Sequence, residues 1–116
     1  MIKDIKVPIY NTRLKLYTDP IKFEEATNQH IDPSYDGASF QDDNGIEYLY
    51  LRKTSLTPQS ASIISHELFH TTYSILNFVG VQLAPQSEEA FAYLQGFLTK
   101  KVYKALKKHN HDTNAT

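Results

Sequence analysis

Two histidines and a glutamate lie close together near the middle of the chain, in the sequence His66-Glu67-Leu68-Phe69-His70. Residues four apart on an α-helix lie one above the other, so His66 and His70 can bind one metal ion together. Glu67 follows His66 by about 100° around the helix, which brings its carboxylate within reach of water on that ion. Zinc binds imidazole nitrogen and carboxylate oxygen, and a hydrolytic zinc keeps one position for water. The motif predicts a zinc site with two histidine ligands and Glu67 as general base.

This His-Glu-x-x-His pattern is weak evidence alone, because a shuffled chain with five histidines would contain it with a probability on the order of one per cent. The alternative is two solvated histidines beside a surface glutamate. Three features favour the metal site. The motif lies in the middle of a helix, the aliphatic face is opposite, and the acidic pair Glu88-Glu89 opens the next helix after a short loop.

The helix that carries the motif has clear end signals. Thr57 is the expected N-cap, Pro58 the first helical residue, and Gly80 the left-handed residue that ends the helix after about Val79. The spacing places one set of residues on the buried face: Ile64, Leu68, Ile75 and Val79. It places another set on the opposite, polar face: Gln59, Ser62, His66, His70, Tyr73 and Asn77.

A second helix is expected from Glu88 to about Lys107, with Ser87 as its cap and Phe91, Leu94, Leu98 and Ala105 along its apolar stripe. Residues 109–116 are polar and are expected to fray. The sequence thus predicts a single domain over residues 1–108 and a flexible tail over residues 109–116.

The N-terminal half shows strand and turn signals. Asn44-Gly45 lies between two β-prone runs, residues 38–41 and 46–51, and predicts a hairpin. A half-buried strand is expected near residues 14–18, followed by a short helix over residues 21–28, and Asp36-Gly37 is interpreted as a turn. The predicted fold class is α+β, with a small antiparallel sheet of about three strands packed on the two long helices.

Composition restricts the partners. The chain has 116 residues, 41% hydrophobic and 22% charged, with a net charge of −1 and no cysteine. Disulfides and thiolate metal sites are therefore excluded, and neither a nucleic acid nor a membrane is an expected partner. The N-terminus lacks an apolar signal region, which predicts a cytoplasmic protein. A group of lysines near the C-terminus is attributed to the negative end of the helix dipole: Lys100, Lys101, Lys104, Lys107 and Lys108.

The motif and the acidic pair resemble the gluzincin group of zinc metallopeptidases, in which a glutamate on a following helix is the third ligand. Eighteen residues, 71 to 88, separate His70 from Glu89, as in the aminopeptidase branch of that group. The segment from Glu88 to Ala92 also resembles the group's Asn-Glu-x-Phe-Ala segment. The resemblance implies Glu89 as the third zinc ligand and a minimal zincin-like domain, whereas Glu88 is interpreted as a carboxylate favoured by the helix dipole.

The stretch from Thr57 to Leu98 is also similar to short metallopeptidase-like proteins of bacteriophages, which share the run Glu-x-x-Ala-Tyr. This implies a location in the host cytoplasm or in the phage particle. Where larger gluzincins place an acidic residue four positions after the ligand glutamate, this chain has Tyr93, which would hydrogen-bond a ligand histidine. Tyr73 is either an oxyanion-stabilising group or a partly buried aromatic. The strand Ile46–Leu51 is the expected partner of an extended substrate.

Three functions remain open at this point. The first is a zinc-dependent peptidase in which Glu67 takes the proton of a zinc-bound water. The second is a structural or interaction protein, such as a phage particle component, which retains a zincin fold without catalysis. The third is a regulatory peptidase that cuts one partner protein. The small size and the lack of a domain that would wall the cleft motivate the second hypothesis. The sequence does not define the oligomeric state.

Overall fold

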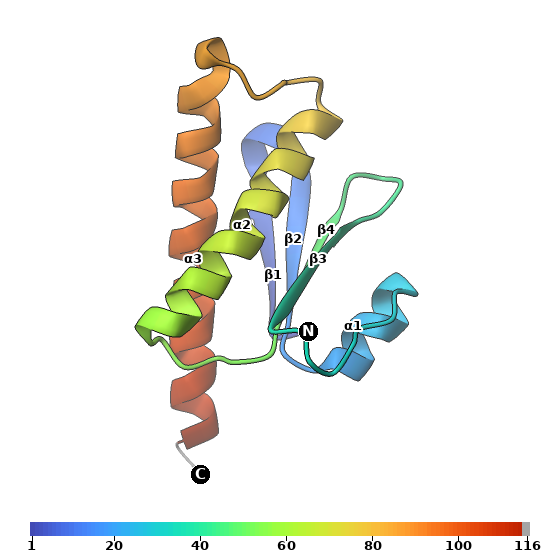
Figure 1. Cartoon of the computed structure of the whole chain (residues 1–116), viewed down its shortest axis with the longest axis vertical. Coiled ribbons are helices and arrows are strands. Elements are labelled where there is room, and N and C mark those ends of the chain that lie inside the picture. Colours follow the sequence, from blue (N-terminus) through green and yellow to red (C-terminus); the bar gives the residue numbers. More distant parts are fainter. Residues whose placement is uncertain (115–116) are drawn as a thin grey trace.

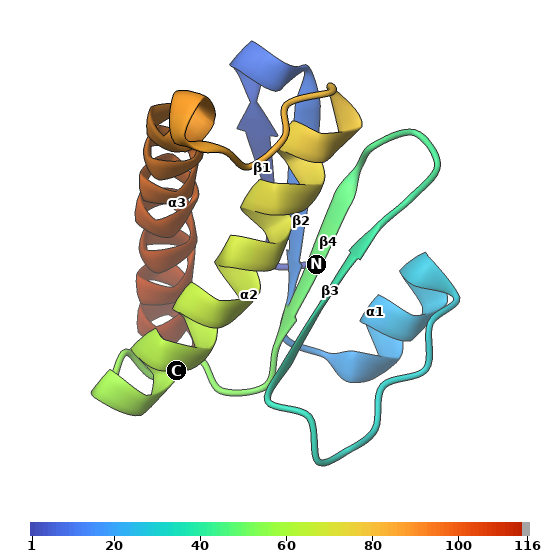
Figure 2. The ribbon, with the colours of Figure 1, turned by 45° about the horizontal axis from the view of Figure 1, so that its top comes forward.

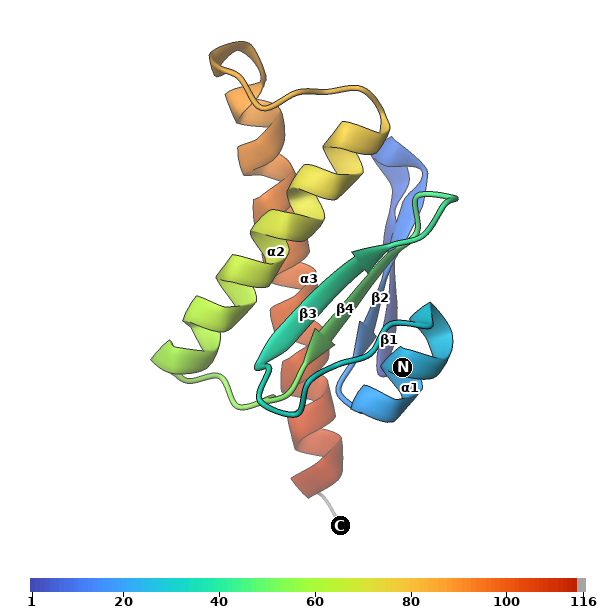
Figure 3. The same ribbon diagram turned by 45° about the vertical axis from the view of Figure 1, so that its right-hand side comes forward.

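A four-stranded sheet with helices on both faces organises the chain (Figure 3). The computed structural model describes residues 1–114. In chain order the elements are β1 (Lys3–Val7), a 3-10 turn (Pro8–Tyr10), β2 (Thr12–Tyr17), α1 (Pro20–Thr27), β3 (Gly37–Gln41), β4 (Glu47–Leu51), α2 (Pro58–Phe78), a second 3-10 turn (Pro85–Ser87) and α3 (Glu88–Asn114). In Figure 1, α2 lies in front of the sheet and packs against α3, which stands to the left of the strands.

The sheet is mixed and has the strand order β1-β2-β4-β3. β1 pairs with β2 and β3 pairs with β4 in antiparallel fashion, whereas β2 and β4 pair in parallel. The α+β class is confirmed, but the expectation of about three antiparallel strands is wrong. The additional strand, β1, is short and rich in charge, so its own sequence gives little strand signal. It is stabilised by pairing with β2, in which Ile5 lies opposite Leu14.

The predicted hairpin is present as β3 and β4. Its turn is held by Asp42, whose side chain accepts hydrogen bonds from the backbone N–H groups of Asn44 and Ile46, each at 2.9 Å. Gly45 has a φ of +80°, a backbone conformation that residues other than glycine rarely adopt. The two-residue turn that Asn-Gly most often makes requires a positive φ at both residues. Asn44 has a negative φ, and the connection is accordingly longer, from residue 42 to residue 46.

Each face of the sheet has its own apolar core. On the face toward α2 and α3, Leu14, Leu16 and Leu49 pack in one cluster with Leu68 of α2 and Leu98 of α3, all with 0% exposure. On the other face, a smaller aromatic cluster joins the sheet to α1: Tyr17, Phe23, Ile31 and Tyr50. The long helices are thus packed against the sheet, and this packing fixes the position of α2.

The ends of α2 agree with the sequence. The Thr57 side chain accepts from the backbone N–H of Ser60 at 3.2 Å, and Gly80 has a φ of +84°. Of the residues predicted for the buried face, Ile64, Leu68 and Ile75 are buried, but Val79 is 46% exposed because it caps the helix beyond its last turn.

Helix α3 begins as expected at Glu88 and continues to Asn114, past the expected end at Lys107. Residues 109–114 of the expected tail are therefore helical, and residues 115–116 lie outside the described part. One reason for the extension is tertiary, since the Asn110 side chain donates to the backbone carbonyl of Thr54 at 2.8 Å. This contact ties the end of α3 to the loop that precedes α2.

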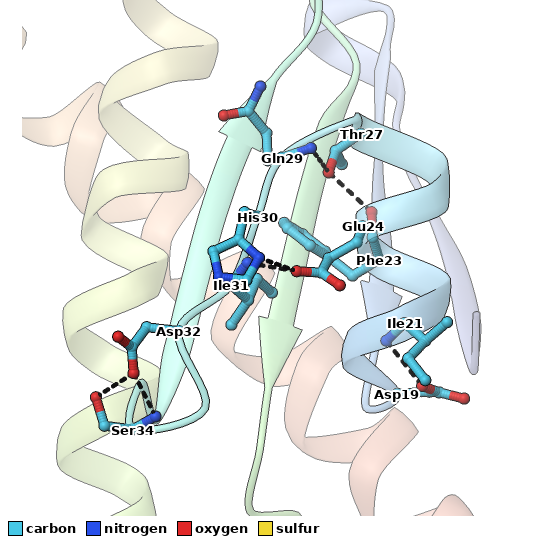
Figure 4. A network of polar contacts seen from close by, with 10 residues as sticks. All are labelled: Asp19, Ile21, Phe23, Glu24, Thr27, Gln29, His30, Ile31, Asp32 and Ser34. Carbon is cyan, nitrogen blue, oxygen red and sulfur yellow. Dashed lines mark hydrogen bonds and ion pairs between the residues drawn. The ribbon is translucent and has the colours of Figure 1, made fainter.

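The segment between α1 and β3 is organised by side chains (Figure 4). Asp19 caps α1 by accepting from the backbone N–H of Ile21 at 2.9 Å. Glu24 accepts from the backbone N–H of Ile31 at 2.6 Å and lies 3.0 Å from the His30 imidazole. His30 is therefore placed beside a structural carboxylate, on the sheet face opposite to α2.

Candidate functional site

The two histidines of the motif project from consecutive turns of α2 with their rings together. Their Nε2 atoms are 3.3 Å apart, and the ring planes are inclined by 76°. Two imidazole nitrogens on a tetrahedral zinc, each bonded at 2.0–2.1 Å, would be roughly 3.3 Å apart. The side chains of His66 and His70 therefore already have the separation that one shared zinc ion requires. A long N–H···N hydrogen bond between neutral rings would give a similar distance.

Glu67 points in a different direction, toward the sheet. Its carboxylate Oε1 lies 3.8 Å from the His66 Nε2, which is too long for a direct hydrogen bond but within ion-pair distance of a protonated imidazole. The Glu67 side chain is 12% exposed, whereas the His66 side chain is 69% exposed. The motif thus combines two accessible imidazoles with a carboxylate that is largely shielded from solvent.

The space for Glu67 exists because β3 begins with a glycine. A Cβ atom on Gly37 would lie 2.9 Å from the Glu67 Cγ and 3.1 Å from the Tyr50 carbonyl oxygen. Sequence reasoning interpreted Asp36-Gly37 only as a turn and missed this role. The only signal in the sequence is a glycine just before a predicted strand. It indicates a close approach of another chain segment to the backbone only when the strand is known to pack on α2.

Burial sets the proton affinity of Glu67. Desolvation raises the pKa of its carboxyl group above the ordinary value, while the positive charge that His66 and His70 can carry acts in the opposite direction. A carboxylate with a raised pKa is a stronger base, which suits a group that takes a proton from water.

The other predicted site residues lie on the outer surfaces of α2 and α3. Tyr73, one turn beyond His70, is 45% exposed, and its ring centroid lies 6.5 Å from that of Phe91 on α3. Glu89 is exposed in the first turn of α3, and Tyr93 is 76% exposed. Within residues 1–114, no group of three or more histidine, aspartate or glutamate side chains is arranged to hold a metal. The structure therefore brings His66 and His70 together but does not bring Glu89 to them.

The strand expected to pair with substrate is not at an edge. β4 lies between β2 and β3, so both of its sides are occupied. β3 is the edge strand on this side, and it packs against α2 (Figure 2). β3 also carries Gly37 beside Glu67. It is therefore β3, and not β4, that lies next to the motif with an unpaired edge.

Comparisons with known proteins add nothing to this geometry: no protein-family model, curated protein or solved structure matches the chain significantly. None of the helices within residues 1–114 combines the length and the apolar character needed to cross a membrane.

Proposed function

We propose that the protein is a zinc-dependent metallopeptidase whose metal is held by His66 and His70, with Glu89 as the third ligand. The observation that carries the proposal is the 3.3 Å separation of the two Nε2 atoms beside a buried glutamate. Glu89 is proposed as the third ligand from its spacing after His70, since the structure does not place it beside the two histidines. When bound at such a site, zinc lowers the pKa of a water molecule toward about 7 and polarises a carbonyl group.

The chain's own residues would perform the remaining steps. Glu67 takes a proton from the attacking water and passes it to the leaving amine, and burial helps by keeping the pKa of its carboxyl raised. The free edge of β3 would align an extended peptide through backbone hydrogen bonds. Tyr73, exposed one turn beyond His70, is the proposed donor to the developing oxyanion.

The solvent exposure of the two histidines favours one alternative function, that of a non-catalytic protein. With the His66 side chain 69% exposed, little of the described chain shields the histidine pair from water, and water-filled sites stabilise developing charge poorly. In this second candidate function, the protein is a non-catalytic structural or interaction protein, such as a phage particle component, that retains the metal for stability.

Metal content and hydrolysis, measured on the same variants, separate these functions. We expect about one zinc per parent chain by elemental mass spectrometry, lost in His70→Ala and Glu89→Ala. The matched controls, His111→Ala and Glu88→Gln, should keep it. On a quenched fluorescent peptide library, Glu67→Gln should retain zinc but lose at least about 100-fold in activity.

Each outcome has a distinct meaning. Zinc binding without turnover in the parent, over the library and over native protein substrates, would favour the non-catalytic protein. A folded parent that takes up no zinc, or a Glu67→Gln variant as active as the parent, would overturn the peptidase. Loss of zinc in Glu88→Gln rather than Glu89→Ala would reassign the third ligand.

A further inference from the structure

A groove with a lysine rim runs between β1 and α3, away from the histidine motif. Its volume is about 670 Å³, and it is lined from the strand side by residues 3–6 and Pro8. Figure 2 shows β1 beside α3. Apolar groups of Ile5, Phe97 and Ala105 contribute to its lining. Its basic residues come from both elements: Lys3, Lys6, Lys101, Lys104 and Lys108.

The charge of this groove is not balanced by the chain. The single acidic residue in the lining, Asp4, has its carboxylate 3.1 Å from the guanidinium of Arg13 on β2. Among residues 1–114, none of the five lysines lies within ion-pair distance of a carboxylate. Because the whole chain carries a net charge of only −1, the groove is a local concentration of positive charge.

The helix dipole does not account for these lysines. Its stabilising effect is confined to about the last turn of a helix. Since α3 continues to Asn114, Lys104 lies nearly three turns, and Lys101 more than three turns, before its end. Lys101 instead lies over the Phe97 ring, with its Nζ 5.6 Å from the ring centroid. The dipole interpretation made from the sequence therefore fails for the part of α3 that lines the groove.

The shape of the groove suits an extended peptide. β1 is an edge strand with one neighbour, so one side of its backbone has no partner in the sheet. The lining of α3 spans Phe97 to Lys108, a length of roughly 16 Å at the rise of an α-helix. An extended chain covers that length with about five residues, which is also the length of β1.

We infer that this groove binds an acidic, extended segment of a partner protein, which adds to the edge of β1 and places its carboxylates among the five lysines. Alternating side chains of such a segment would contact the apolar lining and the lysine rim in turn. A nucleic acid fits less well, because binding of single strands relies on exposed aromatic rings for stacking. The one aromatic ring in the lining, Phe97, is partly buried and lies under Lys101.

The test uses the full chain and a fluorescent, end-capped peptide that alternates glutamate and valine. Fluorescence anisotropy should show binding that weakens with salt, and amide resonances of residues 3–7 should shift in NMR spectra. The double variant Lys101→Gln/Lys104→Gln should weaken binding about tenfold. The matched control, Lys100→Gln/Lys107→Gln, removes the same charge from α3 outside the groove lining and should change binding less than twofold.

Two further probes make the inference falsifiable. A glutamine-valine peptide should not bind, and a glutamate-valine peptide N-methylated at alternate residues should bind at least about tenfold more weakly, because methylation removes backbone donors. Equal loss in the two lysine variants would overturn the inference. So would tighter, groove-dependent binding of an oligothymidine or of anionic vesicles. These measurements are made with EDTA present, so their outcome is independent of the proposed peptidase.

Discussion

Glu47 is a carboxylic acid that the fold places inside the protein, with 1% exposure. Its Oε2 accepts from the Gln41 side-chain amide at 2.6 Å, and the same amide donates to the Ser74 carbonyl of α2 at 2.9 Å. Burial raises the pKa of Glu47 to about 8, partly offset by the Gln41 hydrogen bond and increased by the nearby charge of Asp42. Near neutral pH this residue therefore links β3, β4 and α2 mainly as a neutral acid.

The raised pKa of Glu47 makes the free energy of unfolding depend on pH. The folded state binds the proton more tightly than the unfolded chain, so this stabilisation is complete below pH 4.5 and is lost as pH rises through about 8. Glu47→Gln keeps an acceptor for Gln41 and removes the titration. We expect the variant and parent to be about equally stable at pH 4.5.

At pH 9, the free energy of unfolding of Glu47→Gln should exceed that of the parent by on the order of 5 kcal/mol. Urea unfolding at several pH values measures the difference. The exposed control, Glu25→Gln, keeps Glu47 and should therefore lose stability with rising pH as the parent does. A parent whose stability is flat from pH 5 to 9 would contradict the assignment.

At the scale of elements, the contact between β3 and α2 depends on the missing side chain of Gly37. Gly37→Ala places a methyl group 2.9 Å from the Glu67 Cγ, and such overpacking typically costs about 1–3 kcal/mol. Gly96 in α3 has no atom within 4 Å of its added Cβ, so Gly96→Ala should instead stabilise by about 0.5–1 kcal/mol through helix propensity.

Thermal unfolding of these two variants provides a matched comparison. If the proposed peptidase is correct, Gly37→Ala should also lower hydrolysis while leaving zinc content unchanged, since it moves Glu67 and not the histidines. A Gly37→Ala protein with parental stability would show that Glu67 is not held against β3.

The sequence defined elements with strong local signals. Thr57, Pro58 and Gly80 fixed the ends of α2, and the Asn44-Gly45 turn located the hairpin. It did not define the structural features that depend on contacts between residues outside the same element. β1 is a strand because β2 pairs with it, and α3 is longer than expected where Asn110 contacts the loop before α2.

The candidate site was predictable to a similar degree. The i, i+4 spacing alone brings His66 and His70 together, because helix geometry decides it. The burial of Glu67 depends on β3, and the placement of the first turn of α3 depends on the loop from residues 79 to 87. Neither is encoded in the spacing of the motif.

For the whole molecule, metal binding should appear as stability. A ligand that binds only the folded state at 100 times its dissociation constant contributes about 2.7 kcal/mol. For a domain of this size, that corresponds to a rise of roughly 10 °C in melting temperature. Differential scanning fluorimetry with zinc and then EDTA measures the rise. It should vanish in His70→Ala and persist in His111→Ala, and a rise of equal size in both variants would indicate nonspecific binding.

The parallel pairing of β2 with β4 has a consequence for how the chain folds. The hairpins β1–β2 and β3–β4 each form from residues close in sequence, but their junction joins Leu16 to Leu49, thirty-three residues apart. Closing that loop loses chain entropy before the central core compensates for it. Docking of the two hairpins is therefore expected to limit the folding rate. Leu16→Ala should slow folding, whereas Asn110→Ala, at the end of α3, should mainly accelerate unfolding.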